Sequence, residues 1–298
     1  MDSASYLQTF LRSGTDNVSL SAYFEEVDAT FNPKAFVISR AKDGDRWDHA
    51  FSLLSELGMQ PLKFLAVEGA AEQQRFNGYS KLNPGELGCL LSHMSILQAA
   101  ALHSNPNQYT LVFEDDIIST LRGEASYRTH FDALKRHLMP EIRMVYQGKC
   151  LEQCLCMEPV GDGLFKASQP SCTHAYMIKN SAAREIMVAG GLQHSAFLGL
   201  PIDQGYRNLI QSKQFSALVF HPALFFQEVM QQASALREGS AQMYNYLECV
   251  EMQKSSMHHF FQTACSSPVS ATALVLFTVA VLCVLFFAFR RRSATTRK

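Results

Sequence analysis

Three consecutive carboxylates follow an apolar run near the middle of the 298-residue chain. The run at residues 111–113 is short and does not alternate, which predicts a buried strand of a parallel sheet. Glu114, Asp115 and Asp116 then lie at its carboxyl end, where open α/β sheets bind their ligands. The pattern indicates a cation site, and a solvated acidic turn is the alternative.

The spacing of the three acids indicates which of them would share a cation. If the chain stays extended, Glu114 and Asp116 point to one side and Asp115 to the other, because side chains alternate along a strand. Mg²⁺ and Mn²⁺ prefer oxygen ligands and usually bind one or two carboxylates together with substrate phosphates. We therefore expect Glu114 and Asp116 to be the metal ligands, with Asp115 close to them.

The elements before the acids begin as a β-α-β unit, which predicts an α/β fold. Residues 35–39 predict a first strand and residues 62–67 a second strand. Between them, residues 47–57 predict a helix that ends at Gly58, a natural C-terminal cap.

A well-marked helix precedes the acidic strand. Asn83 is a suitable N-cap, Pro84 suits the first helical position, and Glu86 completes a capping-box pattern. The apolar residues that follow predict one buried stripe, and helical spacing places Glu86 and His93 on one face. Capping alone explains Glu86, whereas His93 is either a partly buried polar residue or part of a site.

The rest of the soluble region continues the alternation of helices and strands. Helices are expected near residues 127–138, after residue 181 and after residue 203, and strands at residues 144–147, 172–178 and 218–220.

The charge distribution argues against nucleic acid as a partner. Five basic residues lie within the last nine, so the rest of the chain carries 21 basic and 27 acidic residues. Residues 269–289 contain no charge, proline or glycine and, at about 1.5 Å per residue, are long enough to cross a bilayer. We expect a C-terminal transmembrane helix with a basic tail at residues 290–298; a buried soluble helix is the alternative.

The sequence leaves the side of the membrane open. The basic tail favours a cytoplasmic C-terminus and a lumenal main domain, whereas the lack of an N-terminal signal peptide favours a cytosolic domain, which is our expectation. Four cysteines suit lumenal disulfides or reduced thiols equally well, and a zinc site among them is a weaker alternative: Cys150, Cys154, Cys156 and Cys172.

Together these pieces resemble glycosyltransferase family 25, which contains bacterial lipooligosaccharide galactosyltransferases and procollagen galactosyltransferases. The resemblance covers roughly residues 35–236, and the C-terminal anchor departs from the usual family architecture. It rests on ordered motifs: Phe36-Val37-Ile38-Ser39-Arg40 with Asp45-Arg46-Trp47, Gly85-Glu86-Leu87-Gly88-Cys89 with Ser92-His93, Phe113-Glu114-Asp115-Asp116, Gly148-Lys149-Cys150, residues 172–176, Pro201-Ile202-Asp203, and Pro222 with Gln227 and Ser234.

The resemblance implies a fold and an activity. The fold is a GT-A type, Rossmann-like domain at residues 35–236, between an N-terminal extension at residues 1–34 and a connector at residues 237–268. The activity is inverting transfer of a hexose, galactose or glucose, from a UDP-sugar to a glycan or protein hydroxyl, with Mn²⁺ or Mg²⁺ held by the acidic motif. The alternatives are a non-catalytic, membrane-anchored binding protein with this fold and a metal-dependent phosphate hydrolase.

The resemblance also suggests a general base, and the position of a histidine after the last strand suggests a late metal ligand. Asp203 matches a family motif and is our candidate base, although it also suits an N-cap or a metal ligand. His221 follows the last strand and is either a metal ligand or an ordinary loop residue before Pro222.

Further residues are expected to contact the donor. Arg46 suits the diphosphate or the nucleotide, and a surface ion pair with Asp43 or Asp48 is the alternative. The remaining candidates on the donor side are Glu86, His93 and Asp115.

Overall fold

The computed structural model describes residues 34–76, 79, 81–149 and 157–228. The expected transmembrane helix, the connector, the basic tail, the N-terminal extension before residue 34, and Cys150, Cys154 and Cys156 lie outside these residues. None of the described helices is long and apolar enough to cross a membrane. The chain divides into two compact units, and apart from Met157 and Glu158 every described residue belongs to the first.

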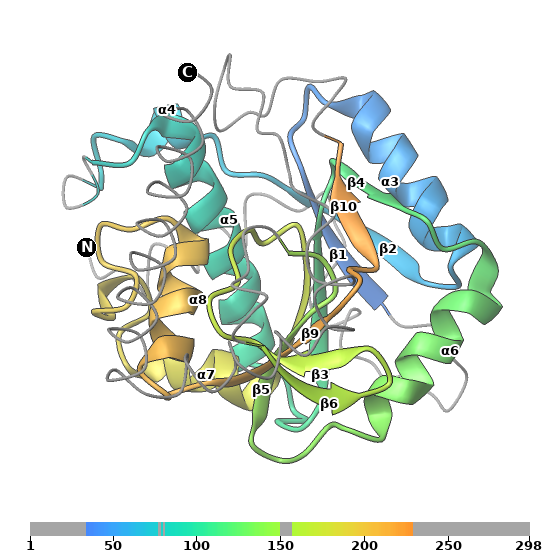
Figure 1. Ribbon diagram of the computed structural model, residues 1–298. Helices are drawn as coiled ribbons and strands as arrows, with labels where there is room; N and C mark the ends of the chain where they lie inside the picture. The colour runs from blue at the N-terminus through green and yellow to red at the C-terminus, as the bar shows by residue number, and fades with distance from the viewer. Residues whose placement is uncertain (1–33, 77–78, 80, 150–156, 229–298) are drawn as a thin grey trace, which may run out of the picture. The chain divides into compact units, whose positions relative to one another are not determined.

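Among the described residues, a mixed sheet of eight strands forms the centre of this unit (Figure 1), in the order β2-β1-β3-β8-β5-β9-β7-β6. A separate two-stranded ribbon pairs β4 with β10. The strands are β1 (Lys34–Ser39), β2 (Gln60–Leu65), β3 (Tyr109–Glu114), β4 (Ile117–Ser119), β5 (Ile142–Tyr146), β6 (Glu158–Gly161), β7 (Leu164–Lys166), β8 (Ala175–Lys179), β9 (Ser216–Phe220) and β10 (Phe225–Gln227).

The direction of β8 sets which chain ends meet at the acidic motif. β3 runs parallel to β1, but β8 is antiparallel to both of its neighbours, β3 and β5. The expectation of a parallel sheet is therefore right for one edge of β3 and wrong for the other. As a result, the start of β8 lies at the same sheet edge as the carboxyl ends of β3 and β5.

Helices cover both faces of the sheet (Figure 1). On one side lie α5, α7 and α8, and on the other lie α3 and α6. The predicted helices are confirmed, with ends shifted by a few residues: α3 (Gly44–Glu56), α5 (Pro84–Ala101), α6 (Gly123–Lys135), α7 (Asn180–Val188) and α8 (Ile202–Gln211); short α4 (Gly69–Glu72) and η3 (Gly191–Gln193) were not predicted.

The helix α5 is buried on nearly all sides, not along one stripe as predicted. Its capping box is confirmed: the Glu86 N–H donates to Asn83 Oδ1 at 2.9 Å, and the Asn83 N–H donates to Glu86 Oε2 at 3.0 Å. Beyond this first turn almost every side chain is buried, His93 included, because the sheet lies on one side and α4, α7 and α8 pack on the others. A helix enclosed in this way has no polar face to preserve.

Glycines let the start of α5 approach the loop after β2. The Val67 N–H donates to Ser92 Oγ at 2.9 Å, and that hydroxyl donates to the Gly88 carbonyl at 2.7 Å. A Cβ on Gly88 would lie 2.5 Å from the Val67 carbonyl oxygen, and one on Gly69 would lie 1.8 Å from that of Pro84. This close contact fixes α5 beside the carboxyl ends of β1 and β3.

We expect Gly88→Ala to destabilise the fold by about 2 kcal/mol or more, because its methyl group meets a backbone oxygen that has no rotamer to change. Urea denaturation followed by circular dichroism measures the loss. Gly44→Ala is the matched control: its Cβ meets no described atom within 4 Å, so we expect a change of less than about 1 kcal/mol. Equal effects of the two substitutions would contradict the close contact.

Candidate active site

The acidic motif does not continue the strand. β3 ends at Glu114, and the chain turns through Asp115 and Asp116 before β4 begins. The prediction that side chains alternate from Glu114 through Asp116, as in an extended strand, is therefore wrong. A single nitrogen of Arg46, Nη2, lies 3.0 Å from Asp115 Oδ1 and 3.0 Å from Asp116 Oδ2.

The shortest ion pairs of Arg46 are with the acidic motif and not with other acids of its helix. It lies in the first turn of α3, its side chain is 12% exposed, and its Nη1 is 4.0 Å from Asp43. The predicted pair with Asp43 is thus present but long, and no ion pair to Asp48 occurs in the described part of the chain. The short contacts go to the two aspartates, which places a positive charge at the wall of the site.

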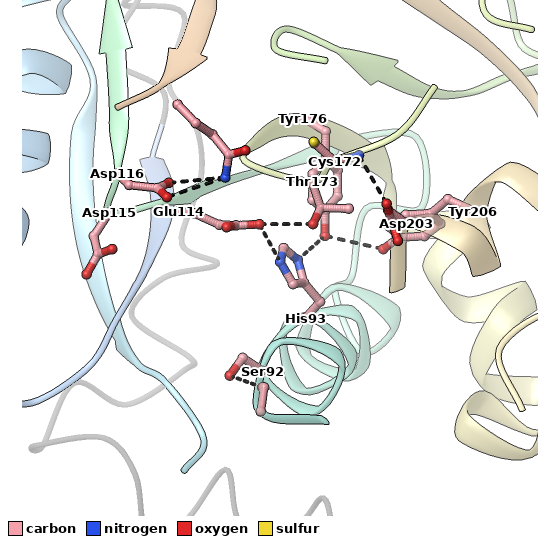
Figure 2. A network of polar contacts seen from close by, with 12 residues as sticks. Ser92, His93, Glu114, Asp115, Asp116, Cys172, Thr173, Tyr176, Asp203 and Tyr206 are labelled. Carbon is pink, nitrogen blue, oxygen red and sulfur yellow. Dashed lines mark hydrogen bonds and ion pairs between the residues drawn. The ribbon is translucent and has the colours of Figure 1, made fainter. Parts of the chain in front are cut away.

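Glu114 turns toward α5 and the start of β8. Thr173 Oγ1 donates to Glu114 Oε1 at 2.9 Å, and His93 Nε2 lies 3.4 Å from the same oxygen (Figure 2). Burial raises the pKa of Glu114, but the hydrogen bond and charge of His93, followed by His174 and Thr173, outweigh it and lower the pKa overall. Glu114 is therefore the carboxylate held in its ionised form.

His93 is completely buried and joins a chain of polar groups beneath the motif. Its Nδ1 lies 2.9 Å from the Tyr176 hydroxyl, which lies 3.2 Å from the Tyr206 hydroxyl (Figure 2). The sequence left open whether His93 is a partly buried polar residue or part of a site. The structure places it against Glu114, a predicted metal ligand.

The surroundings of Asp115 and Asp116 disfavour the ionised form of both side chains. Burial, and then the charge of Glu114, raise the pKa of Asp116 to about 7 in spite of Arg46. Gln227 Nε2 lies 3.4 Å from Asp116 Oδ2. Burial also raises the pKa of Asp115 against the effect of Arg46.

The acidic motif, Arg46 and His93 line one pocket at the carboxyl edge of β1 and β3. Glu114 and Asp116 both border it, and their carboxylate oxygens fit a Mg²⁺ or Mn²⁺ ion. The pocket is lined by Ile38, Arg40, Arg46, Ala66, Val67, Glu68, Gly69, Ala70, Pro84, Gly85, Gly88, Cys89, Ser92, His93, Glu114, Asp115 and Asp116.

Asp203 lies across the site from Asp116, with His93 and Thr173 between them (Figure 2). The N-cap of α8 is Pro201, so Asp203 does not have the capping position that was its alternative explanation. Its carboxylate accepts hydrogen bonds from the backbone N–H groups of Cys172, at 3.3 Å, and Gln204, at 2.8 Å. Cys172 itself is disulfide-bonded.

His221 and Glu86 are placed apart from the acidic motif. His221 follows β9, which is three strand positions from β3, or about 14 Å at the usual spacing. Its ring nitrogens are buried without a hydrogen bond to any described residue, and burial together with Lys149 lowers its pKa to about 4. Glu86 is engaged in the capping box, and the pocket-lining residues of the described chain do not include it.

Sequence reasoning missed four residues that shape the site. Cys89 follows the helical spacing that selects His93, since residues four apart share a helix face, and this spacing was an available signal. Thr173, Tyr176 and Gln227 lie in segments that the sequence matched to family motifs, but no role was assigned to them, because each reaches the site through tertiary pairing of strands.

The pKa of Asp116 predicts a stability that falls as pH rises. The folded protein holds this proton up to about pH 7, whereas the unfolded chain releases it near 3.8, so the folded state binds more protons in between. With a metal chelator present, we expect the free energy of unfolding of Asp116→Asn to match that of the wild type near pH 4, where the amide resembles the protonated acid. At about pH 8 it should be more stable by roughly 2 to 4 kcal/mol in urea denaturation.

Glu114→Gln is the control with the opposite sign. Because the pKa of Glu114 is lowered from 4.5, its contribution to stability is present above that pH and is lost on acidification. This variant should be less stable than the wild type at about pH 8, with a smaller deficit in acid. Two variants that shift in the same direction would overturn the assignment of ionised Glu114 and protonated Asp116.

Comparison with known proteins gives a family and one weakly similar solved structure. The sequence model of glycosyltransferase family 25 (LPS biosynthesis protein) matches residues 32–204. No curated protein matches the chain. Among solved structures, the chain is similar to apo mouse xyloside xylosyltransferase 1 at 11% identity and a TM-score of 0.30, over 62% of this chain and 63% of that one, less than two thirds of its length. The family match covers more than half of the sequence and includes the acidic motif, and the chain therefore belongs to glycosyltransferase family 25.

Proposed function

We propose that this protein is a metal-dependent, inverting glycosyltransferase with a GT-A arrangement. It transfers a hexose, galactose or glucose, from a UDP-sugar to a hydroxyl of a glycan or glycoprotein. The observation that carries the proposal is the pocket at the end of β3, which Glu114 and Asp116 both line in a chain of this family.

The carboxylates of Glu114 and Asp116 would hold the divalent ion. Three acids with a single arginine between them leave a surplus of negative charge, and burial together with the charge of Glu114 raises the pKa of Asp116. Mn²⁺ or Mg²⁺ bound there would neutralise charge on the departing diphosphate.

Arg46 would contact the donor diphosphate once a cation takes over its role at the acids. Its guanidinium already lines the pocket, and an Arg fork suits phosphate oxygens. Asp115 would keep this side chain in place, since it binds the same nitrogen. His93 and Thr173 would act on Glu114, by orienting its carboxylate toward the pocket.

Asp203 is our candidate for the general base. Direct displacement with inversion needs a base on the side of the sugar opposite the leaving group, and Asp203 lies across the site from Asp116 (Figure 2). Two backbone N–H groups fix its carboxylate. It would accept the proton of the acceptor hydroxyl as that oxygen attacks.

For the metal, we expect Glu114→Gln and Asp116→Asn each to lower Mn²⁺-dependent transfer by about 10²-fold or more, measured as UDP release from UDP-galactose and UDP-glucose. Asp115→Asn should have a smaller effect, because its carboxylate binds Arg46. Full activity of the double variant would exclude this metal site. Donor binding without turnover in the wild type would favour the non-catalytic alternative.

For the base, Asp203→Asn should lower kcat by about 10²-fold or more while the Kd of the donor changes by less than about threefold, because a base acts in the transition state. Calorimetric titration with the UDP-sugar and steady-state kinetics separate the two quantities. A collapse of donor affinity would instead assign Asp203 to the metal or the donor.

We further propose that residues 269–289 anchor the protein and that its main domain faces the cytosol. The apolar run supports the anchor, and the disulfide at Cys172 is an observation that favours the lumenal alternative. Protease added to intact microsomes should digest the main domain, while carbonate should leave the protein in the membrane. Protection of the domain, or a glycan on Asn17 in the acceptor sequence Asn17-Val18-Ser19, would place it in the lumen.

A further inference from the structure

A second set of ligand atoms lies in the pocket beside the acidic motif. Among the described residues, Cys89, His93 and Glu114 each offer one donor atom, and the three atoms lie within 4.8 Å of one another. We propose that these side chains form a second cation site, which binds Zn²⁺ or a similar thiolate-preferring divalent ion. This site uses sulfur, nitrogen and oxygen, whereas the acidic motif offers oxygen alone.

The fold brings the three ligands together without any movement of the backbone. Cys89 and His93 are four residues apart on α5 and therefore share one helix face. The close contact at Gly88 fixes that face beside the end of β3, where Glu114 lies. Tetrahedral zinc needs ligand atoms about 3.4 Å apart, which side-chain rotation can supply from the observed positions.

His93 supplies an independent observation that points to a ligand. The side chain is 0% exposed, and its buried Nε2 has only a long contact, 3.4 Å to Glu114 Oε1, with no closer polar partner among the described residues. The other ring nitrogen lies 2.9 Å from the Tyr176 hydroxyl, which fixes the ring so that Nε2 is directed toward Glu114 (Figure 2). A hydrogen bond to the second nitrogen is the usual accompaniment of a metal-bound histidine.

The charges of the ligands balance a divalent ion. A thiolate, a carboxylate and a neutral imidazole sum to two negative charges, so a bound Zn²⁺ leaves the buried site neutral. Burial, and then the charges of Glu114, Asp203 and Asp116, raise the pKa of the Cys89 thiol, so the ion must displace its proton. The same three acids attract a cation. Three protein ligands leave one position open, as in zinc sites that exchange a ligand.

Glu114 belongs to both sites, which makes the two ions competitors. Zn²⁺ on Cys89, His93 and Glu114 would take a ligand from Mn²⁺ or Mg²⁺ at the acidic motif. Since this consequence rests on the proposed function, it predicts that Zn²⁺ inhibits transfer and that excess Mn²⁺ relieves the inhibition.

Direct zinc binding tests the site without using activity. The purified full-length protein in detergent competes with a chromophoric chelator for Zn²⁺. We expect the wild type to have a tight Zn²⁺ site that Cys89→Ser and His93→Gln lack, because an ion left in these variants can bind only the oxygen ligands of the acidic motif. Tyr176→Phe should keep the stoichiometry with about 10- to 100-fold weaker affinity, because it only releases the ring of His93. His103→Gln, on a buried histidine outside the cluster, is the matched control and should resemble the wild type.

A second measurement uses the unmodified chain and remains informative even if a variant fails to fold. Alkylation of Cys89 by iodoacetamide, quantified by mass spectrometry of its peptide, should slow by about tenfold or more with Zn²⁺ and remain unchanged with Mg²⁺. Unchanged labelling in Zn²⁺, or equal zinc affinity of the wild type and folded Cys89→Ser, would overturn the site. Neither measurement requires sugar transfer, so zinc binding and the transferase proposal can fail separately.

Discussion

The whole site is organised by the need to accommodate three adjacent carboxylates at the end of a buried strand. Charges in a low-dielectric interior must be paired or partly protonated. Four neighbouring segments each contribute one polar partner to these acids: Arg46 from α3, His93 from α5, Thr173 before β8 and Gln227 from β10. In this family 25 protein, the acidic motif is thus in contact with hydrogen-bond donors and cations from four different segments.

These partners divide the acidic motif into two electrostatic environments. Histidine and a hydroxyl hold Glu114 ionised, while burial and its neighbours' charge make Asp116 a weaker acid. Glu114 faces α5, so it can share a cation with the sulfur and nitrogen ligands of that helix. Asp116 faces β10 and has only oxygen ligands beside it. Two kinds of cation can therefore be distinguished within one pocket, by the atoms that complete each shell.

Local signals in the sequence predicted the elements well and their arrangement poorly. The cap at Asn83 and the strand before Glu114 were predictable because both depend on nearby residues. The antiparallel direction of β8 was not, since strand direction is decided by distant pairing partners. The alternation of Glu114 and Asp116 failed because the turn after β3 leads into a three-residue strand too short to show any period.

The pairing of β4 with β10 has a consequence for how the protein folds. Gln227 and Asp116 are separated by 111 residues, and β4 and β10 contact each other in a ribbon outside the main sheet. Contacts of such high sequence separation form late, because closing a long loop costs conformational entropy before the contact can stabilise the chain. During synthesis, the acids leave the ribosome long before the strand that encloses them. The enclosure of the acidic motif by β10 is therefore expected to be a late step of folding.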